Sequence, residues 1–375
     1  MTWRRRILAV APLLLVLACG GGDAPPPAQG LNACADTPCL ERELAAIVGA
    51  ADDPSAAVDG IVDAAYEDPG SALLANCHGI MHTVGREYAV RTQLRLAGLM
   101  DAMPRNNDPA CAAGFAHGLV TGLAPEIERA GPDAAERACA EAGTRFQRYS
   151  CTHGFGHAFM RVYDGERGPA LDLCRALGAA TAPDCAQGVY HDYWFAVEGL
   201  DGTTAPPGAV TDPRALCAGE PDAFVPACWY RGFIEIYGDE HPTRSAQDIE
   251  RFCADLGRVQ RRACVTAAIV VGPADPREQL AICRTVRAAD VASCIRGTKV
   301  QNLLTKPEAM QAVLIADCAR FRASSTCYRL LGKALGVITD GRFEQTGCPR
   351  ILRPAARKAC VDGVRSMDGP LGTFS

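Results

Sequence analysis

The chain has 375 residues, 22% of them charged, and a formal net charge of -5, with acidic and basic residues interspersed along the sequence. This balance provides no cationic stripe for a phosphate backbone, so we expect no nucleic-acid partner. Beyond the N-terminal segment, no run approaches the eighteen or more apolar residues of a transmembrane helix.

The N-terminus reads as an export signal followed by a tether. Three arginines at positions 4–6 precede an apolar run from Ile7 to Ala18, the pattern of a secretory signal peptide and too short to span a bilayer. The run ends in Val-Leu-Ala-Cys19, which resembles the lipobox of bacterial lipoproteins; the alternative is an ordinary signal peptide with an incidental cysteine. The resemblance implies cleavage after residue 18 and a diacylglycerol on Cys19. Glycines and prolines follow, so residues 19–33 are predicted to be a flexible tether.

These features predict where the protein works. We expect it in the cell envelope, on the periplasmic or extracellular face, with the outer membrane favoured. The membrane, reached through the lipid anchor, is then its first predicted partner.

The cysteines predict a disulfide framework. Setting Cys19 aside leaves eighteen of the nineteen cysteines, an even number in an exported chain. Fourteen fall into close pairs nine to twelve positions apart, and we expect each pair to form one bridge: Cys139 with Cys151, Cys174 with Cys185, Cys217 with Cys228, Cys253 with Cys264, Cys283 with Cys294, Cys318 with Cys327, and Cys348 with Cys360. Spacing does not decide the pairing of the other four; we favour Cys34 with Cys39 and Cys77 with Cys111.

The cysteines also mark a repeat. The second cysteine of each pair recurs every thirty to forty-three residues from Cys77 to Cys360, a period typical of helix-hairpin repeats. An apolar helix is expected after each marker, as in 327–338, and a second helix before the next first cysteine, as in 169–174 and 276–283, where a proline begins the helix. The pattern resembles in style the disulfide-stapled helical repeats of the Sel1-like kind, although the cysteine spacing is longer and that family's signature is absent.

We therefore predict an all-α fold in which helix hairpins form an α-solenoid or an α/α toroid stapled by disulfides. Strand signals are scarce, because aromatic residues are few and β-branched residues do not alternate. The predicted domain spans 34–375, with a histidine-bearing half at about 70–200 and a histidine-free half at about 201–375.

Six of the seven histidines occupy the same place in four consecutive repeats, just after the marker cysteine. Each segment contains Gly-x-x-His, and two of them contain His-x-x-x-His. Residues four apart lie on one helix face, which is how a helix offers two imidazoles to one metal ion. The candidate metal ligands are His78, His82, His117, His153, His157 and His191; the seventh histidine, His241, is expected in a loop.

Whether these side chains meet depends on the curvature of the array. Parallel helices pack about 10 Å apart, so a flat array lets neighbouring histidines share an ion only in pairs, whereas a closed or tightly curved superhelix brings all four repeats together. Gly79, Gly114, Gly154 and Gly188 lie one turn before each histidine. They are expected to allow close helix approach or to leave room for a ligand.

Neutral imidazoles suit zinc, copper or iron, the three candidate cofactors. The two His-x-x-x-His helices with single histidines resemble, over these short segments only, the ligand arrangement of dinuclear copper proteins such as the tyrosinases. Candidate further ligands, or carboxylates that orient an imidazole, are Glu87, Asp192 and Glu198. Met81 and Met160 are either soft sulfur ligands or core side chains, and the aromatic stretch 190–195 is either core or the wall of a pocket.

The leading hypothesis is an envelope protein that binds a transition metal or a metal-borne cofactor, with redox or hydrolytic chemistry left open. One alternative is that duplication copied histidines with a packing role, but the later repeats keep the cysteine and lose the histidine. Another is a metal-free scaffold that holds a peptide or an envelope protein on its concave surface. Motifs for c-type haem, nucleotides, α/β-hydrolases and helix-borne zinc proteases are absent from the sequence.

Overall fold

A computed structural model describes residues 34, 36–68, 71–198, 207–237, 244–273, 275–298 and 308–366. The predicted signal peptide (1–18), the tether (19–33) with Cys19, and His241 lie outside the described residues. Within them all regular structure is helical, as the sequence predicts. No helix in this described part is both long and apolar enough to cross a bilayer.

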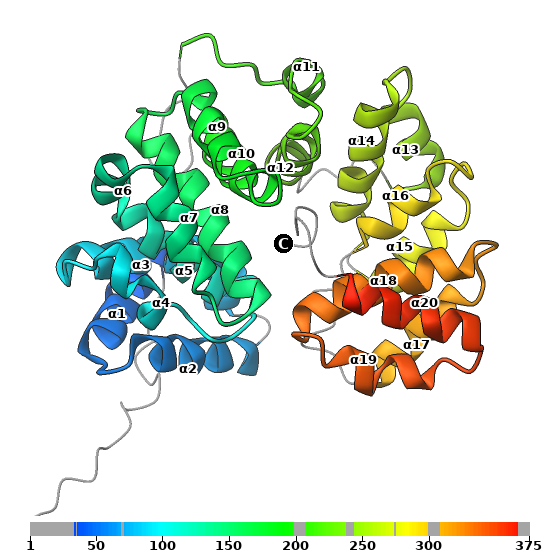
Figure 1. Ribbon diagram of the computed structural model, residues 1–375, viewed down its shortest axis with the longest axis horizontal. Coiled ribbons are helices and arrows are strands. Elements are labelled where there is room, and N and C mark those ends of the chain that lie inside the picture. Colours follow the sequence, from blue (N-terminus) through cyan, green and yellow to red (C-terminus); the bar gives the residue numbers. More distant parts are fainter. Residues whose placement is uncertain are drawn as a thin grey trace, which may run out of the picture.

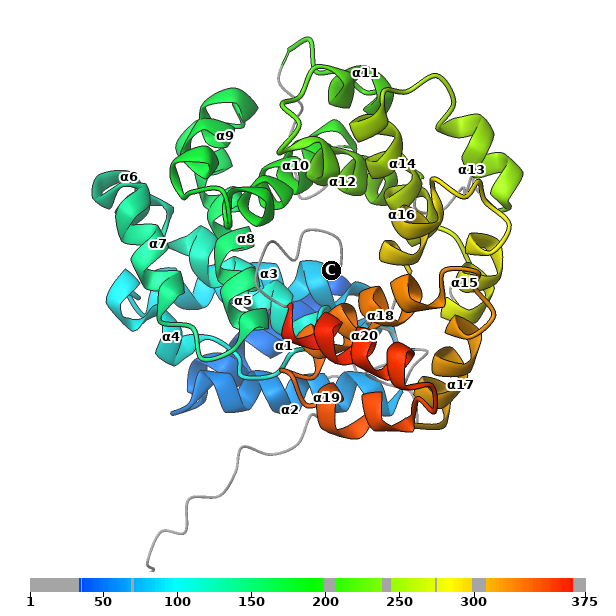
Figure 2. The same ribbon diagram turned by 45° about the vertical axis from the view of Figure 1, so that its right-hand side comes forward.

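The helices form two rows, shown in Figure 2. In the inner row each helix contacts the next along the chain. Its members are α3 (Ala72–Arg91), α5 (Cys111–Gly122), α8 (Arg145–Val162), α10 (Ala182–Glu198), α12 (Val225–Tyr237), α14 (Arg258–Val270), α16 (Val291–Arg296), α18 (Ser324–Ile338) and α20 (Pro354–Arg365). The outer row comprises α6 (Ala124–Ala130), α7 (Pro132–Ala140), α9 (Arg167–Ala176), α11 (Pro213–Ala218), α13 (Ala246–Phe252), α15 (Pro276–Cys283), α17 (Glu308–Cys318) and α19 (Phe343–Thr346).

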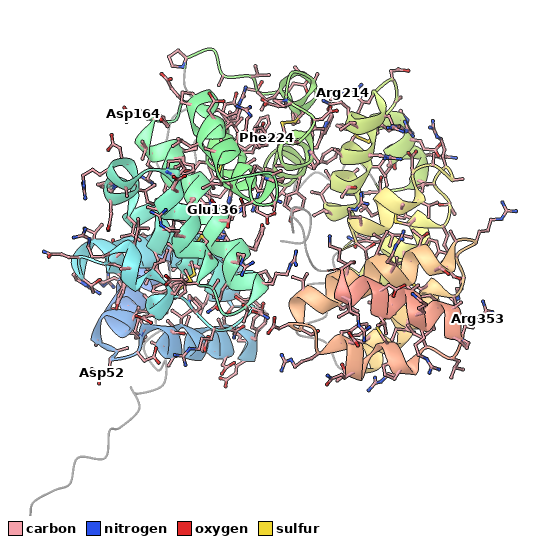
Figure 3. The ribbon with its side chains drawn as sticks, viewed as in Figure 1. Asp52, Glu136, Asp164, Arg214, Phe224 and Arg353 are labelled. Atoms are coloured by element: carbon pink, nitrogen blue, oxygen red, sulfur yellow. A yellow bond between two sulfur atoms is a disulfide. The ribbon has the colours of Figure 1, made fainter. Side chains whose placement is uncertain are left out.

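The N-terminal helices α1 (Thr37–Ala50), α2 (Pro54–Glu67) and α4 (Leu99–Ala102) pack beside the start of the inner row (Figure 1). One apolar core runs through nearly the whole described chain. Exposed charges of both signs, among them Asp52, Asp164 and Arg353, lie around the outside of the molecule (Figure 3). The fold therefore buries its apolar side chains between the two rows and keeps a mixed charged surface.

The inner row curves until its members from opposite ends of the chain meet. Helix α18 contacts α8, and Tyr149 of α8 and Val337 of α18 form a small buried apolar cluster of their own. Of the two architectures predicted from the sequence, the α/α toroid is therefore the one that describes this chain better. Curvature of this degree also determines which side chains of the inner row can meet.

Local sequence signals explain where the helices begin. Asp275 caps α15 and Pro276 is its first residue, as predicted. Thr144 and Gln147 form a capping box at the start of α8, so this helix begins six residues before Cys151. Helix α9 begins at Arg167, two residues before the proline expected to start it.

Most of the other marker cysteines also lie inside their helices, and not ahead of them as the sequence suggested; Cys111 is the first residue of α5. Upstream signals account for some of these starts: Thr144 caps α8 and Pro354 is the first residue of α20, whereas α14, α16 and α18 begin without a side-chain cap. The bridge then forms from within the first two turns. The markers placed in this way in the later inner helices are Cys185, Cys228, Cys264, Cys294, Cys327 and Cys360.

The disulfides tie the two rows together. Each of the seven predicted close pairs forms a bridge from the end of an outer segment to the next inner helix. These bridges join Cys139 to Cys151, Cys174 to Cys185, Cys217 to Cys228, Cys253 to Cys264, Cys283 to Cys294, Cys318 to Cys327, and Cys348 to Cys360. Closing a loop of about ten residues contributes about 3 kcal/mol in the chain-entropy model. The bridges thus stabilise hairpins too short to fold alone.

The favoured pairing of the other four cysteines is also present. Cys34 bonds to Cys39 at the start of the described chain. Cys77 bonds to Cys111, which joins α3 directly to α5. This last bridge connects two inner helices, whereas the seven close pairs each connect an outer segment with an inner one.

Glycines let pairs of inner helices touch backbone to backbone. A methyl group placed on Gly114 would lie 2.3 Å from the carbonyl oxygen of His78, and one on Gly188 would lie 2.1 Å from that of His153. Of the four glycines predicted to allow close approach, these two meet backbone, and Gly154 meets the side chain of Val120. Gly79 has open space beside it. The crossings of α3 with α5 and of α8 with α10 therefore depend on a missing side chain.

The crossing can be tested at Gly114. Substitution Gly114→Ala is expected to destabilise the protein by about 1–3 kcal/mol, because the added methyl forces the backbones of α3 and α5 apart. Gly79→Ala in the same hairpin is the control. It should be neutral or stabilising by up to about 1 kcal/mol, since alanine is the better helix former. Urea unfolding of both variants checks this, and equal stabilities would contradict the close crossing.

Candidate metal centre

The six candidate histidines converge on one place. They come from four successive inner helices: His78 and His82 from α3, His117 from α5, His153 and His157 from α8, and His191 from α10. The ring centroids of His117 and His153 lie 4.3 Å apart, and those of His82 and His157 4.7 Å apart. Even the first and fourth helices meet here, since the rings of His78 and His191 are 5.6 Å apart.

Two overlapping groups have nitrogens close enough to share an ion. The first triad is His82, His117 and His157, and the second triad is His153, His157 and His191; in each, one nitrogen per ring lies within 4.8 Å of the other two. Nitrogens bound to one tetrahedral ion stand about 3.4 Å apart. Each triad would therefore contract by at most about 1.4 Å to bind a metal, a distance that small rotations of the rings can supply.

Hydrogen bonds fix the orientation and the tautomer of several rings. The Nδ1 of His157 donates to Asp192 Oδ1 at 2.6 Å, so in the neutral, metal-binding form of this ring the lone pair is on Nε2. The Nδ1 of His78 lies 3.3 Å from the carbonyl oxygen of Pro109, with the same consequence. A carboxylate or carbonyl on the far nitrogen is the usual support of a metal-binding imidazole. The prediction that Asp192 plays this supporting part agrees with this contact.

The second triad has different neighbours. Arg231 of α12 donates from Nη2 to the Nε2 of His153 at 3.3 Å, and Glu235 lies 3.5 Å from the Nε2 of His191. On its other side His153 Nδ1 is 3.4 Å from the Tyr149 hydroxyl, which donates to Gln187 Oε1. Because a guanidinium only donates, the lone pair on His153 Nε2 is already engaged.

In contrast, five of the six rings keep a buried nitrogen that has no hydrogen-bond partner within the described ranges. These atoms are the Nε2 of His78, His82 and His157, both ring nitrogens of His117, and the Nδ1 of His191. A buried polar atom left without a partner costs about 1–3 kcal/mol. An array of them on facing rings is therefore costly for a packed core, whereas a metal ion bound to several of them removes that cost.

Burial keeps these imidazoles neutral. It lowers the pKa of His78 to about 4, and the guanidinium of Arg231 acts in the same direction. Burial, followed by neighbouring imidazoles or Arg231, also holds the pKa values of four other rings well below their ordinary range: His82, His117, His153 and His191. A neutral ring is the form that binds a metal, so these ligands are ready at neutral pH without releasing protons.

Arg231 and Glu235 were missed in the sequence, although a signal was present. The fifth repeat reads Arg231-Gly232-Phe-Ile-Glu235, and Glu235 stands three residues after the glycine, where earlier repeats have histidine. Arg231 precedes that glycine as His78 and His153 precede theirs. Both side chains are nearly buried, at 8% and 10% exposure. A search for Gly-x-x-His alone passes over this repeat.

The remaining candidates lie elsewhere. Glu87 is exposed on α3, and the side chain of Glu198 lies outside the described part of the structure. Met81 and Met160 are buried in the apolar core, in agreement with the packing interpretation. In the aromatic stretch Tyr190, Tyr193 and Trp194 belong to the core. Phe195 packs edge-on against His191 at 4.4 Å between centroids, so the stretch is mainly core with one ring beside the histidines.

Comparison with known proteins adds no identification. The chain matches no family model, no curated protein and no solved structure.

The low pKa values predict an acid-sensitive metal-free protein. An unfolded histidine binds a proton near pH 6.5, whereas folded His78 does so only near pH 4. Between these values the unfolded state binds more protons, so the free energy of unfolding decreases as the pH falls from about 6.5 to about 4. We expect the urea midpoint, measured with a chelator present, to drop steadily across this window.

Two variants provide the control for this pH dependence. His117→Leu removes one depressed imidazole and should make the slope shallower. Met160→Leu, a buried change on α8 outside the cluster, should leave the slope unchanged. A urea midpoint that stays constant between pH 7 and pH 4.5 in the unsubstituted chain would contradict a cluster of neutral histidines.

Proposed function

We propose that this protein is a lipid-anchored protein of the cell envelope that binds a transition metal ion through its clustered histidines. The observation that carries the proposal is the set of facing imidazoles whose buried nitrogens have no hydrogen-bond partner in the described chain. The first triad is the best site, because each of its rings keeps such a nitrogen and His157 is oriented by Asp192.

A purely structural role explains the cluster less well. Histidines kept for packing bond to neighbouring carbonyls or waters through their polar atoms. Here His117 is 1% exposed and neither of its nitrogens has a partner among the described residues. Its ring instead stacks on His153 and stands edge-on to His82. Such placement favours a common ligand of positive charge over a hydrogen-bonded core.

The donor set favours zinc or copper over iron. Three imidazoles with an open fourth position are a common ligand set of zinc, and imidazole also suits copper. Non-haem iron sites usually add a carboxylate to two histidines. At the first triad the nearest carboxylate, Asp192, bonds the far nitrogen of His157 and so supports a ligand instead of being one. An open position would also allow chemistry at the ion.

Two features of the chain support the proposed location in the cell envelope. Nine disulfides indicate an oxidising compartment outside the cytoplasm. The finer proposal of a lipid anchor in the outer membrane rests on the lipobox pattern at Cys19. One lipid-modified cysteine followed by a flexible tether would hold the toroid close to the membrane surface.

The metal proposal predicts loss of binding on removal of His157. Oxidised protein from the periplasm should carry close to one ion per chain by elemental analysis. His157→Ala should abolish stoichiometric binding, because this ring belongs to both triads. Asp192→Asn should weaken the affinity about 10–100-fold by loosening the orientation of the His157 ring.

Met160→Leu is the matched control, and metal content and affinity should not change in it. Wild-type protein that contains no stoichiometric ion, and whose unfolding is indifferent to chelator, would sink the metal proposal. The metal-free scaffold for an envelope protein or peptide would then be the better hypothesis.

The anchor has its own test. Cys19→Ala should move the protein from the membrane fraction to the soluble fraction, because no acyl chain can be attached. The control is the double substitution Cys34→Ser with Cys39→Ser, which removes the nearest disulfide but leaves the lipobox intact and should stay with the membrane. Detergent phase partition measures both. A Cys19→Ala protein that remains membrane-bound would refute the anchor.

A further inference from the structure

We propose that the guanidinium of Arg231 takes the place of a second metal ion at the second triad, so that the chain binds one ion where its six histidines would suggest two. This inference rests on the proposed function of the first triad. It concerns the part of the cluster that a tyrosinase-like arrangement would assign to a second ion.

Arg231 contacts one ring of the second triad directly and reaches a second ring through Glu235. Its Nη2 lies 3.3 Å from the Nε2 of His153, and its Nη1 lies 3.6 Å from Glu235 Oε1. The same carboxylate oxygen lies 3.5 Å from the Nε2 of His191. Two of the three rings of the second triad, His153 and His191, are therefore engaged by the ion pair of Arg231 and Glu235.

The repeat register explains how this ion pair arose in the site. The positions before the glycine and three after it carry His78 and His82 in the first repeat, and His153 and His157 in the third. In the fifth repeat the same two positions carry Arg231 and Glu235. An ion pair therefore projects from α12 where two repeats before it present a pair of imidazoles, and it reaches the same cluster.

Arg231 is fixed as well as placed. Its side chain is 8% exposed, and its guanidinium lies over the ring of Tyr230 at 5.4 Å. A guanidinium stays charged at all ordinary pH values and only donates hydrogen bonds. It therefore occupies the lone pair of His153 and keeps the carboxylate of Glu235 engaged in an ion pair, and both effects oppose a second cation there.

In the described part of the chain, no guanidinium forms a hydrogen bond with a ring nitrogen of the first triad. The Nε2 atoms of His82 and His157 and both nitrogens of His117 have no hydrogen-bond partner among the residues the structure describes. The geometry thus divides one cluster of six rings into a site that can bind an ion and a site closed by a resident cation. We therefore expect a mononuclear metal centre with an arginine next to it.

Zinc stoichiometry tests the inference. The wild-type chain, dialysed against zinc and passed over a desalting column, should retain one ion per chain, and Arg231→Gln should retain two. Because the one open nitrogen of His157 serves the first triad, the second ion would be held by His153, His191 and the released carboxylate of Glu235. Arg231→Lys keeps the charge and is the matched control, expected to retain one. Adding His153→Ala to Arg231→Gln should return the count to one, because the second ion needs that ring.

The outcomes separate this inference from the proposed function. Wild-type protein that retains neither zinc nor copper overturns the proposed function and this inference together. Wild-type protein that retains two ions, or a folded Arg231→Gln variant that still retains one, overturns this inference alone. If Arg231→Gln does not fold, copper(II) decides on the wild type: one isolated spin per chain by electron paramagnetic resonance supports the inference, and two copper ions per chain overturn it.

Discussion

The close crossing of inner helices through glycine is the contact on which the histidine cluster depends. Gly114 faces the backbone of His78, and Gly188 faces that of His153. Each glycine that brings two helices together therefore lies opposite a histidine of the neighbouring helix and one turn before a histidine of its own helix. The helix packing that forms the fold therefore also forms the histidine cluster. Any side chain at these glycines would separate the helices and widen the spacing of the imidazoles.

The disulfides and the curvature of the inner row allow short helices to keep this close crossing. Each hairpin buries little surface alone, and the bridges between the rows hold consecutive hairpins in register. The register then places equivalent positions on the same side of successive helices, and there the imidazoles of four helices meet. Six imidazoles consequently share one buried space, where burial lowers the pKa of five of them and five keep a ring nitrogen without a hydrogen-bond partner among the described residues.

The six histidines do not have equivalent surroundings, because the charged residues beside them come from different repeats. Asp192 stands beside His157 and leaves one nitrogen of that ring available, whereas Arg231 uses a nitrogen of His153. Two triads that share a ring therefore differ in charge and in the lone pairs they can offer. The fifth repeat keeps the two positions of the first and third repeats but carries Arg231 and Glu235 there instead of two histidines.

From the sequence alone came the helical class, the hairpin period, the bridges and the six histidines, because each depends on spacing along the chain. Pairing of Cys77 with Cys111 needed the structure, since spacing did not single it out. The closure of the ring and the contact of His78 with His191 also needed the structure. The contacts of Arg231 and Glu235 with the histidines were also visible only in the tertiary structure. Many small rotations between successive repeats add up to decide which distant residues meet, and no single segment of the sequence determines their total.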